Sequence, residues 1–338
     1  MNNYILVLGL GSMGKRRIRN LKKLGVKNIV GFDLRKDRRV EAIEKYNIKV
    51  FSNFQAAISK YIFDAFIISL PPDIHHIYMK KSLELSIPSF IEASVLDTKF
   101  EELISESIKK KVLLAPSCTL FFHPAIKKIA KIIKNEELGN ISNFLYHSGQ
   151  YLPDWHTYED VKDYYVSKKE TGGGREIVPF ELTWITLVLG FPKRVVGLYK
   201  GSIKIKGAEE INDTYNLLMD YGNSIFNLSV DVVSRNATRR LVINGSEKQL
   251  SWNWEDNMIK IYNPEQKKWN KINYETSAAQ AGYNKNITEQ MYIDEMESFI
   301  KAANNECSFP NTLQHDHQVL KTLYAVEKSD NNNNIETL

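Results

Sequence analysis

The feature that most constrains the fold is a glycine-rich turn close to the start of the chain. An apolar run of strand length, residues 4–10 (YILVLGL), leads into the pattern Gly9-x-Gly11-x-x-Gly14. An amphipathic segment follows, and a second apolar run ends at Asp33, nineteen residues after Gly14. A strand, a glycine turn, a helix, a strand and an acidic residue in this order predict a dinucleotide-binding unit.

Each part of this turn has a physical task. Gly9 allows the tight turn, Gly11 lets a pyrophosphate approach the backbone, and Gly14 lets the helix pack closely on the sheet. The helix that begins around Ser12 and Met13 presents unpaired N–H groups to the phosphates. A tight turn that binds no nucleotide is the alternative interpretation.

The residues after the second strand bear on the choice of cofactor. Asp33 is expected to accept hydrogen bonds from a ribose with a free 2′-hydroxyl, which favours NAD over NADP. Arg35 and Lys36 follow at once, and they could hold a 2′-phosphate if Asp33 turned away. The basic run at 15–17 is interpreted as a solvated face of the first helix.

Strands and helices keep alternating up to about residue 121. Apolar runs at 64–70, 87–94 and 111–117 predict three more strands. Asp73 is a candidate N-cap for a helix that reaches about Leu85. Repeated strand–helix units predict an α/β fold with a parallel, doubly wound sheet.

Hairpin signals dominate residues 195–272. A Gly-Asn turn at 222–223 and an Asn-Gly turn at 244–245 each separate two apolar runs, which predicts an antiparallel sheet. Two helices are expected at about 287–304 and 312–328. We therefore predict a nucleotide-binding domain over 1–121, a second domain over 122–330 and a polar, frayed tail over 331–338.

Composition excludes several classes of protein. Of the 338 residues, 43% are hydrophobic and 25% are charged, which is typical of a globular chain, and the net charge of +5 gives no argument for nucleic acid. We expect no signal peptide and no membrane span, because no apolar run reaches about 18 residues. The two cysteines form no disulfide or metal pattern, so we expect a cytoplasmic protein without a metal.

Five motifs follow one another along the chain in an order that is typical of one protein family. They are GLGSMG (9–14), LPPDIHH (70–76), FIEAS (90–94), FFHPAI (121–126) and ELGNI (137–141). With them the chain resembles the Gfo/Idh/MocA family, named after glucose–fructose oxidoreductase and inositol dehydrogenase. The resemblance implies a Rossmann domain followed by an α/β domain on a large, open, mostly antiparallel sheet. It also implies NAD(P)-dependent chemistry on a secondary alcohol of a sugar or cyclitol, and a homodimer or homotetramer formed across that sheet.

The resemblance adds cofactor contacts to the glycine loop and Asp33. The matching positions are Leu70, Pro71, Pro72 and His75, in a stretch beside the nicotinamide ribose, and Glu92, the acid of the family's Glu-Lys-Pro. The chain also departs from the family. Ala93 stands in place of the lysine, Ser94 in place of the proline, and Val178 in place of an aspartate on a later helix.

Two stretches of the second domain contain groups that suit a sugar. Residues 151–165 include Tyr151, Trp155 and Tyr158, whose rings suit the apolar faces of a sugar. A surface loop whose aromatic rings pack on the sheet is the alternative. Residues 168–184 match the family's Gly-Gly-Gly turn and the helix after it, and Arg175 completes the expected substrate set.

Hydride transfer also needs a group that takes the hydroxyl proton. His156 is the first candidate, because an unperturbed pKa of about 6.5 suits neutral pH. Glu181 is the second, since the family's histidine position falls on Phe180 or Glu181, and Lys169 is the third. The alternatives are a loop histidine satisfied by a neighbouring acid and a buried Glu181 paired with Arg175 or a lysine.

The leading hypothesis is an NAD(P)-dependent oxidoreductase that acts on a sugar, by analogy a nucleotide-activated or surface-polysaccharide sugar. One alternative is an epimerase that holds NAD tightly. Another is a sensor that kept the fold and lost the chemistry, which the apolar Ala93 and Val178 favour.

Overall fold

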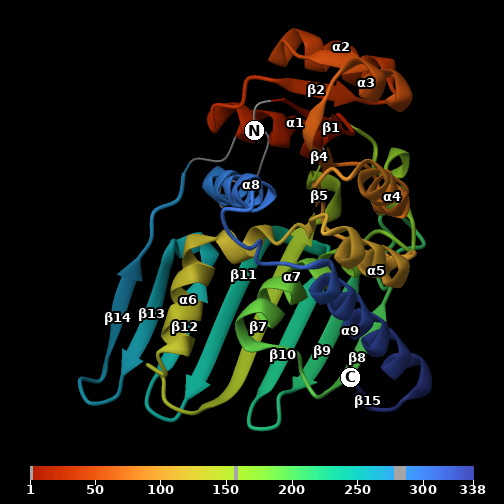
Figure 1. The fold of residues 1–338 in the computed structure, drawn as a ribbon. Helices are drawn as coiled ribbons and strands as arrows, with labels where there is room; N and C mark the ends of the chain where they lie inside the picture. The colour runs from red at the N-terminus through yellow and green to blue at the C-terminus, as the bar shows by residue number, and fades with distance from the viewer. Residues whose placement is uncertain (1–2, 156–158, 278–286) are drawn as a thin grey trace. The chain divides into compact units, whose positions relative to one another are not determined.

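The computed structural model describes residues 3–155, 159–277 and 287–338, and the chain forms two compact units (Figure 1). The first unit contains Met1–Thr119 and Tyr292–His317, and the second contains Leu120–Met291 and Gln318–Leu338. The first division lies close to the boundary expected from the sequence. Residues 292–317, however, group with the first unit, whereas the sequence placed them in the second domain.

The first unit is built on a six-stranded parallel sheet with the order β3-β2-β1-β4-β5-β6. Its strands are β1 (Tyr4–Leu8), β2 (Ile29–Phe32), β3 (Lys49–Phe51), β4 (Phe63–Ile68), β5 (Ser89–Ile91) and β6 (Leu114–Pro116). The helices between them are α1 (Ser12–Lys23), α2 (Lys36–Tyr46), α3 (Phe54–Lys60), α4 (His75–Leu85) and α5 (Phe100–Lys110). The predicted doubly wound sheet is confirmed, and its apolar strands are buried as parallel strands are.

Two local expectations in this unit are wrong. The basic run of α1 is not a solvated face, because Arg16 and Arg17 are 2% and 0% exposed. Asp73 does not cap α4, because it lies in a short 3₁₀ turn, Pro72–Ile74, and Ile74 occupies the N-cap position without a side-chain hydrogen bond. Gly25 does end the α1 segment as expected, with a φ of +82° just after the C-cap.

The second unit is built on a nine-stranded sheet with the order β14-β13-β12-β11-β7-β10-β9-β8-β15. Its strands are β7 (Ile141–Tyr151), β8 (Arg194–Lys200), β9 (Thr214–Asp220), β10 (Ile225–Asp231), β11 (Val233–Gly245), β12 (Gln249–Asn253), β13 (Met258–Asn263), β14 (Lys268–Asn273) and β15 (Glu336–Thr337). The hairpins β9–β10, β11–β12 and β13–β14 are antiparallel, as predicted, while β7 and β10 pair in parallel. The Asn-Gly turn expected at 244–245 is wrong, because both residues lie in β11 and the turn follows at 246–247, where the N–H of Gly245 donates to the carbonyl of Lys248 at 3.0 Å.

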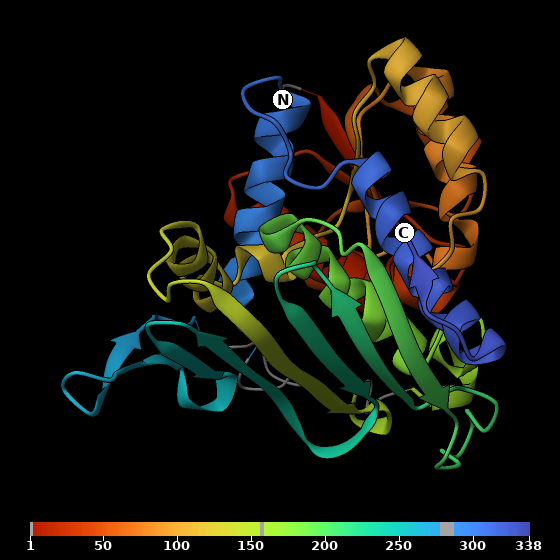
Figure 2. The same ribbon diagram turned by 90° about the horizontal axis from the view of Figure 1, so that it is seen from below.

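Helices cover one face of this sheet and leave the other face open (Figures 1 and 2). The covering helices are α6 (Pro124–Lys134), α7 (Gly174–Leu189) and most of α9 (Leu313–Asn332), while α8 (Glu289–Ala303) belongs mainly to the first unit. Burial alternates along the strands accordingly. On β7, Phe144, Tyr146 and Ser148 are buried, whereas Leu145 between them is 48% exposed.

The expected frayed tail is wrong. Glu336 and Thr337 form strand β15, which pairs with β8 at the edge of the sheet. Lys328 of α9 also forms an ion pair of 2.6 Å with Glu336. A polar sequence can therefore end in an ordered strand when an edge supplies free backbone partners. None of the helices within residues 3–155, 159–277 and 287–338 combines the length and the apolar composition that a membrane span needs.

Candidate functional site

The glycine turn after β1 forms a tightly packed cradle at the start of α1. Gly9 has a φ of +91°, a conformation that side chains disfavour. A Cβ atom on Gly14 would lie 1.8 Å from the carbonyl oxygen of Gly9, so the helix packs directly on the turn. Gly11 is the N-cap of α1 and has no side chain that could cap the first N–H groups. These features fit the diphosphate of a dinucleotide.

Asp33 follows β2, and its carboxylate is hydrogen-bonded both to the glycine turn and to the loop after β2. Its Oδ2 accepts the N–H of Leu10 at 2.8 Å, and its Oδ1 accepts the N–H of Arg35 at 2.8 Å. The side chain therefore faces the glycine turn and does not turn away toward solvent. Arg38 lies near it, with Nη1 at 3.9 Å from Asp33 Oδ2, while the exposed Arg35 pairs with Asp37 at 2.7 Å.

The loop after β4 holds a buried histidine. His75 is 3% exposed, and its Nε2 donates to the carbonyl of Leu70 at 2.7 Å. Burial lowers the pKa of His75, so the ring is neutral and Nδ1 is an acceptor. Pro71 and Pro72 complete the loop and lead into the 3₁₀ turn. This histidine therefore fixes the loop at the carboxyl end of β4.

Glu92 follows β5 and is held by an arginine that the sequence analysis did not single out. Arg17 donates from Nε to Oε1 at 2.7 Å and from Nη2 to Oε2 at 3.0 Å. Ser69, after β4, donates to Oε1 at 3.2 Å. Arg17 precedes Glu92 by 75 residues, so only the packing of α1 on the sheet brings the pair together.

In the second unit, Glu181 of α7 is a fully satisfied buried carboxylate. Its Oε1 accepts hydrogen bonds from Ser148 at 2.7 Å and from Arg239 at 2.9 Å. Its Oε2 accepts from Tyr146 at 2.8 Å and from Trp184 at 2.9 Å. The alternative of a buried, paired Glu181 therefore has direct support, although the partner is Arg239 and neither Arg175 nor a lysine.

The other described candidates of this unit have separate surroundings. Tyr151 ends β7 and stacks against the guanidinium of Arg235 at 3.9 Å. Trp155 is half-buried, and its Nε1 has no hydrogen-bond partner among the described residues. Arg175 is 9% exposed and pairs with Glu327 at 2.7 Å. Lys169 is exposed on the turn before α7, while His156 and Tyr158 lie outside the described residues.

A Tyr–Glu pair next to α7 was missed by the sequence analysis. Tyr165 donates to Glu176 Oε1 at 2.6 Å, while Glu176 Oε2 is buried without a partner among the described residues. Burial raises the pKa of Glu176 from 4.5 to about 8, although the hydrogen bond from Tyr165 acts against this rise. A carboxyl group that titrates there can exchange protons near neutral pH. The only signal in the sequence is that both residues flank the glycine turn.

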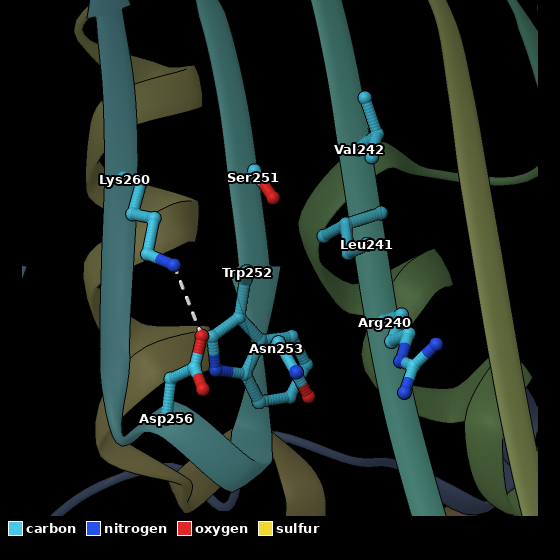
Figure 3. Close-up of a pocket in the computed structure, with 8 residues that line it drawn as sticks. All are labelled: Arg240, Leu241, Val242, Ser251, Trp252, Asn253, Asp256 and Lys260. Carbon is cyan, nitrogen blue, oxygen red and sulfur yellow. Dashed lines mark hydrogen bonds and ion pairs between the residues drawn. The ribbon is translucent and has the colours of Figure 1, made fainter. Parts of the chain in front are cut away.

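The open face of the second sheet has a shallow hollow of about 310 Å³ across β11, β12 and β13 (Figure 3). Lys260 of β13 forms an ion pair of 3.0 Å with Asp256, and Arg240 lies on β11, on the other side of β12. The lining residues are Arg240, Leu241, Val242, Ser251, Trp252, Asn253, Asp256 and Lys260. None of the residues expected to bind a sugar lines this hollow.

Metal-ligating side chains do not gather in the described part of the chain. It contains no group of three or more histidine, cysteine, aspartate or glutamate side chains that could hold a metal ion. Among these residues His147 has an acidic neighbour, Asp231, at 2.7 Å, but this pair lies on the sheet with Ser234 as its third member.

Two sequence models of one family match the chain. Residues 4–102 match the Gfo/Idh/MocA oxidoreductase family's NAD-binding Rossmann fold, and residues 130–337 match its C-terminal alpha/beta domain. No curated protein matches the chain in sequence.

Solved structures share the fold over nearly the whole chain. Levoglucosan dehydrogenase in complex with NADH and levoglucosan has a TM-score of 0.85 and 14% identity. The match covers 99% of this chain and 98% of the dehydrogenase chain. An oxidoreductase from Agrobacterium radiobacter in complex with NAD+, L-tartaric acid and magnesium has a TM-score of 0.84 and 11% identity, covering 100% and 98%. A candidate myo-inositol dehydrogenase from Sinorhizobium meliloti 1021 has a TM-score of 0.79 and 16% identity, covering 99% of both chains. At these identities the likeness establishes the fold.

Proposed function

The chain belongs to the Gfo/Idh/MocA family of NAD-binding oxidoreductases, and from this premise we propose that it transfers a hydride between NAD and a sugar or sugar derivative. The reacting group of the substrate is a secondary alcohol or the matching ketone. The observation that carries the proposal is the cradle of Gly9, Gly11 and Gly14 tied to Asp33, because each part has the geometry that a dinucleotide requires.

The cofactor site that we propose lies at the carboxyl ends of the strands of the first unit. The N–H groups at Ser12 and Met13 hold the diphosphate, and Asp33 with its neighbour Arg35 holds the adenine ribose. Leu70, Pro71, Pro72, His75 and Glu92 form the wall at the nicotinamide half. Bound NAD supplies the hydride chemistry, and the protein supplies position and a proton acceptor.

NAD is the proposed cofactor in preference to NADP. Asp33 faces the glycine turn through the N–H groups of Leu10 and Arg35, which keeps its negative charge where a 2′-phosphate would have to bind. Arg35 is engaged with Asp37 and Arg38 lies beside Asp33, so neither cation displaces that charge.

The substrate wall that we propose belongs to the second unit and includes Tyr151, Trp155, Tyr158 and Arg175. Rings and polar groups of these kinds suit a sugar, and the indole N–H of Trp155 is a donor without a partner among the described residues. The names of the fold neighbours, levoglucosan dehydrogenase and a candidate inositol dehydrogenase, point to a polyol of this size. A nucleotide-activated or surface-polysaccharide sugar, and hence a role in carbohydrate biosynthesis, remains the proposal by analogy.

His156 is still the first proposed proton acceptor, with Glu181 and Lys169 after it. Four donors already fill the carboxylate of Glu181, which favours a structural role for it. The Tyr165–Glu176 pair is the competing acceptor, because its carboxyl group keeps one oxygen without a partner among the described residues. Single variants His156→Ala and Glu176→Gln separate the two, since the acceptor's variant loses turnover and keeps NAD affinity.

Two other functions make different predictions. A sensor would bind NAD and a sugar and never reduce the cofactor, and an epimerase would interconvert two sugars without releasing NADH. The test incubates the protein with NAD+ and a panel of sugars and polyols while the nicotinamide absorbance is followed. NADH formed with one sugar supports the oxidoreductase, and product isomers without NADH support the epimerase. Binding without either reaction supports the sensor.

A second copy of the chain is the proposed partner, and the cytoplasm is the proposed location. Large apolar side chains gather on the open face of the second sheet and suit a homodimer or homotetramer. They are Leu145, Leu198, Leu218, Ile225 and Trp269, which are 42–60% exposed. Cys118 and Cys307 are free thiols, as a reducing compartment permits.

A further inference from the structure

A buried ion cluster lies at the carboxyl ends of β5 and β6 in the first unit. Arg17 binds both oxygens of Glu92, and its Nη1 donates to Glu295 Oε2 of α8 at 2.8 Å. The side chains of Arg17 and Glu295 are 0% exposed, while that of Glu92 is 12% exposed. The cluster therefore reaches the surface of the unit at Glu92.

This cluster has an excess of negative charge. One guanidinium faces two carboxylates, and the remaining donors to Glu295 are neutral. They are the Ser117 hydroxyl at 2.9 Å, the Cys118 N–H at 2.7 Å and the Thr119 hydroxyl at 2.7 Å. Burial would lower the pKa of Arg17, but the two carboxylates outweigh it and raise that pKa, so the cation is permanent.

Arg16 is a second buried cation near the cluster, and it packs on the Tyr292 ring at 4.1 Å, the ring that Arg17 also contacts at 5.4 Å. Three other titratable groups near the cluster carry no positive charge. His75 feels the charge of Glu92, yet burial lowers its pKa and keeps the ring neutral. Burial raises the pKa of the Cys118 thiol, which also stays neutral. Asp316 acts electrostatically on Cys118, and burial raises the pKa of Asp316 to about 6, so it can only add negative charge.

The topology places this cluster at the nicotinamide half of the proposed cofactor site. A dinucleotide lies across the carboxyl ends of the strands, with its diphosphate at the helix after β1 and its adenine ribose at the acid after β2. The strand order β3-β2-β1-β4-β5-β6 leaves β4, β5 and β6 for the other half. Glu92 directly follows β5, and Ser117 directly follows β6.

We propose that the Arg17–Glu92–Glu295 cluster makes this site bind NAD+ more tightly than NADH. The oxidised nicotinamide ring carries a positive charge that the reduced ring lacks, and a net negative cluster attracts only the charged ring. By linkage, the cluster shifts the hydride equilibrium on the protein toward the alcohol. The inference rests on the proposed cofactor function, and it makes Glu295 and Arg17 positioning residues that act through Glu92.

The test compares the dissociation constants of NAD+ and NADH by calorimetry, without any substrate. Glu295→Gln removes one charge and keeps the shape, and Ala93→Lys adds a cation beside Glu92 at a half-exposed position. Each variant should lower the ratio of the NADH dissociation constant to the NAD+ dissociation constant by at least about threefold. Asp64→Asn is the matched control, because Asp64 lies near the amino end of β4 and should leave the ratio unchanged.

The outcomes separate this inference from the function on which it rests. The cluster's role is supported when the ratio of the NADH to the NAD+ dissociation constant is above one in the wild type and falls in both Glu295→Gln and Ala93→Lys. Equal ratios in the wild type, Glu295→Gln and Ala93→Lys overturn it while leaving the NAD-dependent function intact. A wild-type protein that binds neither form overturns both. Should Glu295→Gln fail to fold, the ratio in Ala93→Lys alone decides, and an unchanged ratio there overturns the proposal.

Discussion

Arg239 donates to Glu181 at 2.9 Å, and the two side chains are 5% and 0% exposed. The pair joins β11 to α7 in the second unit, and the guanidinium also lies 4.4 Å above the ring of Trp254. A carboxylate in this setting stabilises the fold only while its partner is present, because a lone charge is costly to bury.

The variant Glu181→Gln should therefore lower the free energy of unfolding by about 3–5 kcal/mol, since it leaves Arg239 without its countercharge. Urea unfolding measures this loss. Glu84→Gln is the control, because Glu84 forms an exposed pair with Lys81 and its loss should cost under about 1 kcal/mol. A stable Glu181→Gln protein that has lost turnover would instead support proton transfer by Glu181.

The variant Gly14→Ala should weaken NAD binding by at least about tenfold, because the new methyl group would collide with the Gly9 carbonyl and displace the turn. Fluorescence titration with NADH measures the affinity. Gly25→Ala is the control, since a Cβ there meets open space and only the backbone angle is strained. Unchanged affinity in Gly14→Ala would remove the proposed diphosphate site.

The variant Asp33→Asn should reduce the preference for NAD+ over NADP+ by about tenfold or more, because the charge that repels a 2′-phosphate is gone. Dissociation constants for both cofactors give the preference. Glu41→Gln removes a charge from α2, where Glu41 pairs with Lys15, and should leave the preference as it is. A wild type that prefers NADP+ would contradict the proposed cofactor.

The variant Glu176→Gln should become more stable relative to the wild type as the pH rises. The folded pKa of about 8 exceeds the ordinary 4.5, so the folded chain keeps a proton that the unfolded chain has lost. The stability from this residue is complete below pH 4.5 and is lost as the pH rises through about 8. Urea midpoints at about pH 6 and about pH 9 measure the difference, and parallel pH profiles would contradict it.

Leu145→Glu together with Leu218→Glu should dissociate the proposed homodimer or homotetramer, because two charges would be buried on the open sheet face. Analytical ultracentrifugation measures the mass of the particle. Leu34→Glu is the control, because Leu34 is 77% exposed in the first unit. An unchanged oligomer in the double variant would place the subunit contact on another surface.

The parallel sheet of the first unit and the hairpins of the second could be predicted from the sequence. Local chemistry decides both, because a glycine turn between Leu8 and Ser12 and a Gly-Asn turn at 222–223 admit few backbone conformations. The sequence also determined which residues form the cradle, since Gly9, Gly14 and Asp33 lie within one strand–helix–strand unit.

Which charges meet depends on the packing of segments that are far apart in the sequence. Arg17 and Glu295 are 278 residues apart, and Glu181 and Arg239 are 58 apart, so no periodicity predicts either pair. The basic run of α1 had the pattern of a solvated face, and the tail had the composition of a frayed end. Packing overrode both, because a buried guanidinium is stable where two carboxylates surround it and a polar strand is stable where a sheet edge supplies hydrogen bonds.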